Sequence, residues 1–167
     1  QVMEFARRRA QNHLKTTLYA MLAGCTSTSN VELRRWFDFK VAASMGHEWQ
    51  VSKGTVAAGF DAWLSAEPRR PFGLVDTMQC MEIDFPAWLQ AVWNHRERIK
   101  AAGGALWGWR NDSGDLAALS IEQYMAFLTH PLAQDPWFME RMRVILTNDI
   151  DEYSAHSMIA QIITVMR

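Results

Sequence analysis

Residues 38–65, DFKVAASMGHEWQVSKGTVAAGFDAWLS, contain the one local pattern in this sequence that points to a biochemical activity. The pattern predicts two helices joined by a polar turn, as in a helix-turn-helix motif. Ala42 would be the small residue that allows close packing, Gly46 the turn residue, and Val51 the apolar residue that fixes the turn. Ser52 would cap the second helix by accepting a backbone N–H of its first turn.

Two features of the same stretch favour an ordinary helical hairpin instead. Residues 47–50 lengthen the turn beyond the tight form of the motif. The second helix lacks Arg, Asn and Gln, the types that pair bidentately with purine edges, and offers Lys53 and Thr55 to a DNA groove. Both interpretations therefore stay open at this point.

The charge of the chain is balanced overall but not along its length. The formal net charge is −1. Residues 1–70 hold ten Lys or Arg and six Asp or Glu, a balance of +4, whereas residues 71–167 hold seven and twelve, a balance of −5. A basic N-terminal half fits a polyanionic partner such as double-stranded DNA. It fits equally well two halves that attract each other, or self-association.

The composition predicts one globular domain with a core rich in tryptophan. The chain has 167 residues, of which 49% are hydrophobic and 21% charged, with eight Trp and ten Met. This length is enough to bury a sizeable core in a single domain over 1–167. Most Trp are expected in that core. Trp107 and Trp109, which lie close together in a predicted loop, are the candidates for an exposed partner-binding surface.

Helical periodicities and capping signals occur along most of the chain. Apolar residues recur at helical spacing over 2–23, and capping boxes or caps followed by helical patterns begin at Ser29, Asp84, Ser120 and Asp135. Sustained period-2 alternation is absent, so a sheet of any size is not expected. The predicted fold is therefore all-α, a compact bundle of about seven or eight short helices.

A loop at 67–73 is the clearest break in the predicted helices. It reads EPRRPFG and coincides with the change in the sign of the charge. It is a candidate hinge between subdomains or a basic loop that contacts phosphates, although a plain surface turn explains it as well.

The last predicted helix carries the best catalytic candidate. Asp149, Glu152 and His156 follow one another at spacings of three and four, so they share a helix face and could bind a metal or act as acid and base. Acidic residues at the start of a helix also stabilise its dipole without any chemistry. Because no paired spacing nominates further ligands, we predict no catalytic residue, metal or cofactor.

The two cysteines and the hydropathy pattern favour a cytoplasmic protein. Cys25 and Cys80 form neither a metal-spaced pair nor a disulfide framework. The sequence Leu22-Ala23-Gly24-Cys25 resembles a lipoprotein cleavage site but lacks the long apolar run before it. No segment approaches the length of a membrane span, so no membrane association is expected.

Taken together, the residues favour a DNA-binding regulator over an enzyme. Lys53 and Thr55 would enter the major groove. The phosphate contacts would come from Arg34, Arg35, Arg69 and Arg70. The alternative is a protein-interaction module, such as an inhibitor or adaptor, that binds its partner through exposed Trp and Met and has no catalytic activity.

Overall fold

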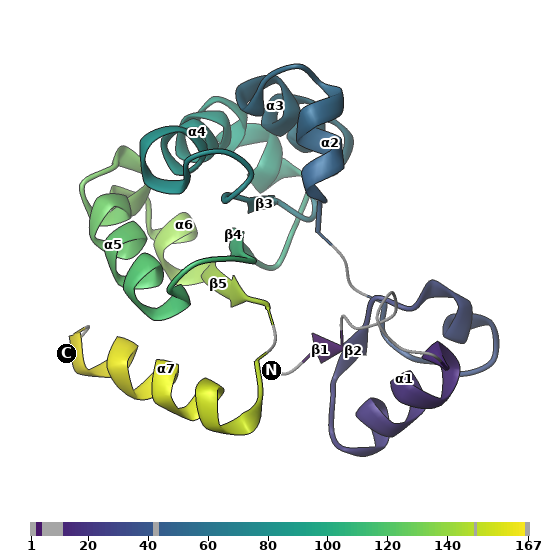
Figure 1. Cartoon of the computed structure of the whole chain (residues 1–167). Coiled ribbons are helices and arrows are strands. Elements are labelled where there is room, and N and C mark those ends of the chain that lie inside the picture. Colours follow the sequence, from purple (N-terminus) through teal and green to yellow (C-terminus); the bar gives the residue numbers. More distant parts are fainter. Residues whose placement is uncertain (1–2, 5–11, 42–43, 149, 166–167) are drawn as a thin grey trace. The chain divides into compact units, whose positions relative to one another are not determined.

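The computed structural model describes residues 3–4, 12–41, 44–148 and 150–165 (Figure 1). Contacts within the chain group residues 1–43 and 44–167 into two compact units. The predicted hinge at 67–73 lies inside the second unit. A single domain over 1–167 stays a prediction.

The first unit contains a short helix and two very short strands. Its elements are β1 (Met3–Glu4), α1 (His13–Leu22), β2 (Ser27–Thr28) and the 3-10 helix η2 (Val31–Arg35). β1 and β2 pair in parallel. Helix α1 begins at His13 because the side chain of Asn12 accepts the backbone N–H of Lys15 at 3.0 Å. Of the helix predicted over 2–23, residues 5–11 lie outside the described part, and Met3 and Glu4 form a strand instead.

The second unit alternates helices and strands. In chain order its elements are α2 (His47–Ser52), α3 (Val56–Ala66), β3 (Phe72–Leu74), the π-helix η3 (Cys80–Asp84), α4 (Phe85–Ala101), β4 (Trp107–Asn111), α5 (Leu116–Leu128), the 3-10 helix η4 (Pro131–Gln134), α6 (Pro136–Arg141), β5 (Met142–Leu146) and α7 (Glu152–Val165).

The three strands of this unit form one parallel sheet in the order β3-β4-β5. Neighbours in the sheet are thus neighbours in the sequence, and helices connect them. Figure 1 shows α3, α4 and α5 curving around the strands. This consecutive order is that of strands in a (β/α) barrel, whereas the strand order of a doubly wound sheet reverses at a switch point.

The prediction of an all-α fold is therefore wrong. The strands escaped notice because a parallel strand that is buried on both faces does not alternate between apolar and polar residues. All five residues of β4, which reads WGWRN, are buried. β3 has only three residues, too few for a period to be recognised.

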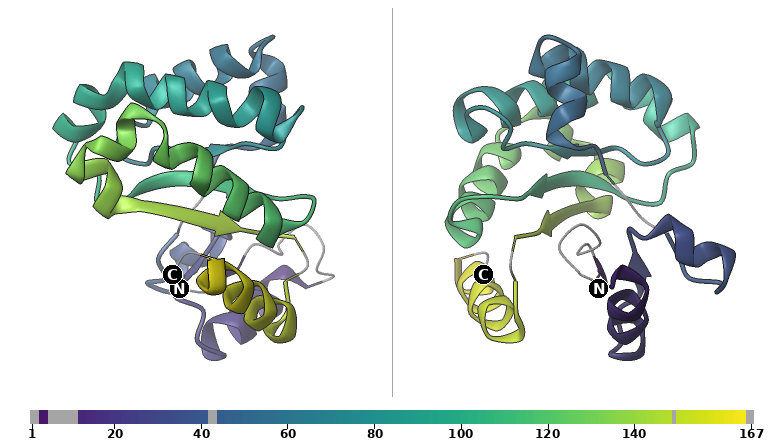
Figure 2. Two further views of the ribbon diagram at one scale, coloured as in Figure 1. Left: turned by 90° about the vertical axis from the view of Figure 1, so that its left-hand side faces the viewer. Right: turned by 45° about the vertical axis from the view of Figure 1, so that its right-hand side comes forward.

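The core of the second unit lies between the sheet and its helices. Figure 2 shows these helices as a layer along the strands. Trp88 of α4 and both Trp107 and Trp109 of β4 are completely buried. Trp107 lies edge-on to Phe127 and Phe138, with ring centroids 5.6 and 5.2 Å away. The expectation of an exposed pair at Trp107 and Trp109 is not met, because both rings belong to this core.

The two faces of β4 differ in what they carry. Side chains alternate between the faces of a strand, so Trp107, Trp109 and Asn111 share one face, and Gly108 and Arg110 share the other. The first face packs against the helices: Trp107 Nε1 donates to the carbonyl of Phe138 at 2.6 Å. We call the faces the helix-facing and the inner face of β4.

Local capping signals located some helices well and others poorly. Asp135 caps α6 as predicted, accepting the N–H of Trp137 at 3.0 Å. Helix α5, by contrast, begins four residues before the predicted cap at Ser120, because Asp115 accepts the N–H of Ala118 at 3.1 Å. Within the described residues, no helix is long and apolar enough to cross a membrane.

Candidate functional site

Polar side chains gather where the three parallel strands end. β3 leads into Asp76 and Thr77, β4 ends at Arg110 and Asn111, and Thr147 follows β5. The carboxyl ends of parallel strands meet at one edge of a sheet, and in (β/α) barrels the active site lies at this edge. We refer to this group, together with His47 of α2 and Asp112 after β4, as the strand-end cluster.

Arg110 is the cation at the centre of the strand-end cluster. Only 7% of the residue is exposed, and it lies on the inner face of β4 between Leu74 and Ile145 of the neighbouring strands. Its Nη2 lies 3.3 Å from Asp112 Oδ2, and its Nη1 donates to Ser44 Oγ at 3.1 Å. A guanidinium held this way is oriented before any ligand arrives.

Asp76 joins the loop after β3 to the turn after β4. One carboxylate oxygen, Oδ2, accepts the backbone N–H of Asp112 and the hydroxyl of Ser113, both at 2.7 Å. The other, Oδ1, is buried and has no hydrogen-bond partner among the described residues. An unsatisfied buried acceptor is costly, so its presence here is a reason to expect a donor from a ligand.

His47 lines the cluster from helix α2. Its Nδ1 lies 3.0 Å from Thr77 Oγ1, and its Nε2 lies 3.9 Å from Asp112 Oδ2. Thr77 in turn donates to the amide oxygen of Gln50, whose nitrogen donates to the carbonyl of Leu74 at 2.9 Å. These contacts tie the imidazole to the end of β3.

Thr147 closes the cluster on the β5 side. Its backbone N–H donates to the carbonyl of Asn111 at 3.0 Å, which extends the pairing of β4 and β5 by one residue. Its hydroxyl lies 2.6 Å from Asp112 Oδ1. Both oxygens of Asp112 therefore have partners, and the carboxylate is held between Arg110 and Thr147.

The chemistry of the cluster fits a polar ligand that carries both an anionic group and hydrogen-bond donors or positive charge. One buried guanidinium can bind an anion such as a phosphate or a carboxylate. The two carboxylates can accept hydrogen bonds from hydroxyl groups or stabilise positive charge. Within the described residues, no three His, Cys, Asp or Glu side chains are arranged to hold a metal ion.

Cys80 lies close to the cluster but is a poor nucleophile. Burial raises the pKa of its thiol to about 11, and the carboxylates of Asp76 and Asp84 act in the same direction. A hydrogen bond from Gln123 Nε2, 3.0 Å from Sγ, opposes them only in part. The thiol stays protonated at neutral pH and is suited to packing.

The structure does not form the helix-turn-helix predicted over 38–65. Residues 38–40 are not helical, and Gly46 precedes α2 as its N-terminal neighbour and does not form the turn. The turn lies later, between α2 and α3, and Thr55 caps α3 by accepting the N–H of Ala58 at 3.1 Å. Ser52, the predicted cap, is the last residue of α2.

The residues predicted to bind DNA belong to different units, Arg34 and Arg35 to the first and Lys53, Thr55, Arg69 and Arg70 to the second. The ammonium of Lys53 lies 4.5 Å from the ring centroid of Trp49. Arg69 donates to the carbonyl of Ala102 at 3.1 Å, and Arg70 is exposed beside it in the turn after α3. Arg35 is exposed in η2 of the first unit. The remaining phosphate contact, Arg34, also belongs to η2, and its side chain lies outside the described part.

The carboxylate and imidazole pattern of the last helix gains no support from the structure. Asp149 and the side chain of Glu152 lie outside the described part of the chain, and His156 is exposed on α7. The members of the strand-end cluster were not predicted. The signal that could have found them is the polar run Arg110-Asn111-Asp112-Ser113-Gly114 directly after the apolar residues 105–109.

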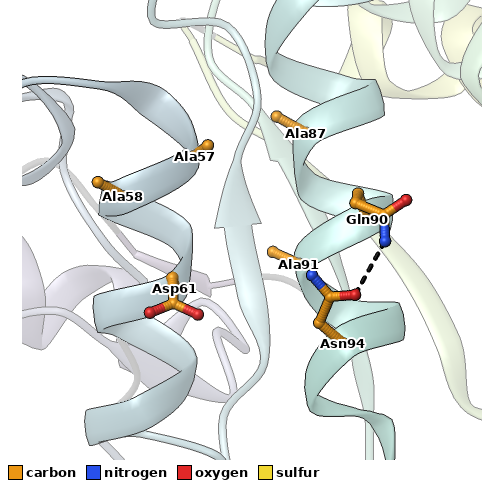
Figure 3. A pocket seen from close by; sticks show the side chains of 7 residues that line it. All are labelled: Ala57, Ala58, Asp61, Ala87, Gln90, Ala91 and Asn94. Atoms are coloured by element: carbon orange, nitrogen blue, oxygen red, sulfur yellow. Dashed lines mark hydrogen bonds between the residues drawn. The ribbon is translucent and has the colours of Figure 1, made fainter.

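A hollow lies between α3 and α4 (Figure 3). It has a volume of about 390 Å³ and is lined by Ala57, Ala58, Asp61, Ala87, Gln90, Ala91 and Asn94. Gln90 Nε2 donates to Asn94 Oδ1 at 2.9 Å, and Asp61 Oδ1 lies 2.7 Å from His95 Nε2. Each polar side chain of its lining thus has a partner in the lining or next to it. The buried oxygen Oδ1 of Asp76, by contrast, has none among the described residues.

A solved structure is similar to nearly the whole chain. It is a crystal structure of human nicotinic acid phosphoribosyltransferase, with a TM-score of 0.71 and 23% sequence identity. The match covers 99% of this chain and 41% of the human protein, so the chain spans less than half the length of that protein. No protein-family model and no curated protein sequence matches the chain. The likeness establishes an α/β fold.

This fold overturns the function predicted from the sequence. The DNA-binding regulator is wrong, because the fold is similar to that of an enzyme and the expected helix-turn-helix is absent from the described residues. The alternative, a non-catalytic interaction module that binds through exposed Trp and Met, stays a prediction: Trp107 and Trp109 are buried, whereas Trp36 and Met78 are exposed.

Proposed function

We propose that the strand-end cluster is part of the active site of a phosphoribosyltransferase that acts on nicotinic acid or a similar pyridine carboxylate. The observation that carries this proposal is the position of Arg110, Asp112 and Asp76 at the carboxyl ends of adjacent parallel strands. The likeness to nicotinic acid phosphoribosyltransferase supports the choice of reaction class.

The charges of the cluster suit the groups of a phosphoribosyl donor and of nicotinic acid. Phosphate, diphosphate and the pyridine carboxylate are anions, and Arg110 offers a buried, oriented guanidinium. The ribose hydroxyls are donors, and Asp76 Oδ1 is a buried acceptor that lacks a partner among the described residues. Ligand binding would remove the cost of this unsatisfied oxygen.

The carboxylates also suit the transfer step. In phosphoribosyl transfer the bond from C1 of the ribose to the diphosphate oxygen breaks, and the pyridine nitrogen forms a bond to the same carbon. Diphosphate leaves with the electron pair, so positive charge develops on the sugar in the transition state. Fixed negative groups near that charge lower the barrier. Asp112 fits this role because Thr147 and Arg110 hold its two oxygens in place.

The test is turnover and binding by the full chain. Phosphoribosyl diphosphate and nicotinic acid would be supplied, formation of the mononucleotide followed, and binding of diphosphate measured by calorimetry. Arg110→Gln should lower kcat/KM by about 10²–10³-fold, the range found when one preorganised donor is removed.

Arg143→Gln is the matched control. Arg143 lies near the amino end of β5, whereas the cluster lies at the carboxyl ends of the strands. Arg143 is also exposed. Its replacement should leave kcat/KM within a few-fold. A folded wild-type chain that neither turns over the two substrates nor binds diphosphate would refute the proposed function.

A further inference from the structure

Gln123 of α5 lies at the centre of a buried polar network behind the strand-end cluster. The residue is completely buried, although it carries an amide. Its Oε1 accepts Trp109 Nε1 at 2.6 Å and Asn111 Nδ2 at 2.8 Å. Its Nε2 donates to Asn111 Oδ1 at 2.9 Å, with Cys80 Sγ at 3.0 Å. The amide of Gln123 is therefore satisfied at both ends.

Asn111 and Gln123 form a reciprocal pair, in which each amide donates to the other. This geometry fixes both side chains more tightly than a single bond would. Asn111 is also completely buried and is the last residue of β4. A pair of leucines could fill the same space without buried polar groups, so packing alone does not explain the choice of residues.

The pair acts on the residues that flank Asn111 in the chain. Arg110 and Asp112 precede and follow it, and alternation along the strand directs Arg110 to the inner face when Asn111 is held on the helix-facing face. The carbonyl of Asn111 also accepts the N–H of Thr147, whose hydroxyl contacts Asp112. Rotation of the end of β4 would thus move the guanidinium and the carboxylate together.

We propose that Gln123 is a positioning residue, which through its amide pair with Asn111 fixes the end of β4 and thereby aims Arg110 and Asp112 at the ligand. The identity of the ligand rests on the proposed function; the positioning itself does not. Misplacement of such groups by about 1 Å can cost about 100-fold in rate.

The experiment compares Gln123→Leu with the double variant Asn111→Leu/Gln123→Leu in the full chain. The single variant leaves the amide of Asn111 buried without its partner, whereas the double variant removes that amide as well and regains part of the stability. Both variants leave Trp109 Nε1 without its acceptor, so this loss is common to the two and cancels in the comparison. If the pair serves positioning, the double variant stays impaired although it is stable. Gln90→Leu is the matched control, because it removes an exposed Gln that is also bonded to an Asn.

The first readout needs no substrate. It is the rate of hydrogen exchange at the backbone amide of Asp112, which donates to Asp76, divided by the rate at the backbone amide of Trp88 in the core. We expect this ratio of rates to rise about tenfold or more in Gln123→Leu and in the double variant, and to stay at the wild-type value in Gln90→Leu. An unchanged ratio in a folded double variant would overturn the proposal.

The second readout is the dissociation constant for inorganic diphosphate. We expect it to rise about 10- to 100-fold in the double variant, with kcat falling more than KM rises. Wild-type affinity in a folded double variant would also overturn the positioning role. If the wild-type chain itself binds no diphosphate, the proposed function fails, and the exchange ratio still decides whether Gln123 positions the end of β4.

Discussion

The two faces of β4 use neighbouring residues of one strand for opposite purposes. On the helix-facing face, Trp107 and Trp109 pack among the aromatic rings of the core and have their indole N–H groups bonded. On the inner face, Gly108 leaves room and Arg110 brings a charge to the strand end. The difference teaches that a strand of five residues can carry both the stability of the fold and the chemistry of its site.

The largest effect on stability is expected from the helix-facing face. Trp109→Ala removes a completely buried ring and leaves the Gln123 carbonyl without its indole donor. We expect a loss of about 3–5 kcal/mol in the free energy of unfolding, measured by urea denaturation.

Met125→Ala is the control for this substitution. Met125 lies on α5 as Gln123 does, but 55% of it is exposed, so the change should stay within about 0.5 kcal/mol. Equal losses in the two variants would mean that the helix-facing face of β4 is not the part that stabilises the unit.

A smaller effect is expected at Gly108 on the inner face. Its φ is +156°, and an added Cβ would lie 1.7 Å from the carbonyl oxygen of Arg143 on β5. Because the obstacle is backbone, Gly108→Ala must separate the two strands, and we expect a loss of about 2–4 kcal/mol. Thermal unfolding followed by circular dichroism would measure it.

Gly103→Ala separates strain from crowding. Gly103 also has a positive φ, +71°, but an added Cβ meets nothing within 4 Å. This variant should lose only about 1–2 kcal/mol, the cost of the left-handed conformation. If Gly108→Ala lost no more than Gly103→Ala, the close approach of β4 and β5 would not require glycine.

The sequence could predict elements whose signals are local. Helix α6 follows from Asp135 and Pro136, a cap and a proline in the first turn, and both signals act within a few residues. The start of α5 was misplaced because two acceptable caps, Asp115 and Ser120, compete there, and only packing decides between them. Ser120 is buried, with its hydroxyl bonded to the carbonyl of Leu116.

The sheet and the site could not be predicted in the same way, because their information is not local. β3 and β5 are strands only because β4 lies between them. Likewise Asp76, Arg110 and Thr147 are ordinary polar residues until three strand ends bring them together. Lys53 and Thr55, which the sequence assigned to a DNA groove, are engaged locally in a ring contact and a helix cap.

The smallest effect on stability is expected among the helices that cover the helix-facing face of β4, at the ion pair between Lys100 of α4 and Asp135, the cap of α6. Burial alone would raise the pKa of the Asp135 carboxyl, but bonds from Lys100 and from the backbone N–H groups of Trp137 and Phe138 outweigh it and hold that pKa below its ordinary value. A carboxyl with a lowered pKa contributes stability above its unfolded pKa of about 3.9, and this contribution is lost as the pH falls through the folded value.

Asp135→Asn isolates this contribution because Asn can still cap α6. We expect the variant to lose about 0.5–1 kcal/mol relative to the wild type at pH 7, and the difference to vanish below the folded pKa of Asp135. Urea denaturation at a series of pH values would measure both. Lys100→Gln should cause a similar loss at pH 7 and no further loss when combined with Asp135→Asn, since the pair is one interaction. A difference that persists unchanged into acid would contradict a role of the Asp135 charge, because the ion pair with Lys100 is lost once the carboxyl is protonated.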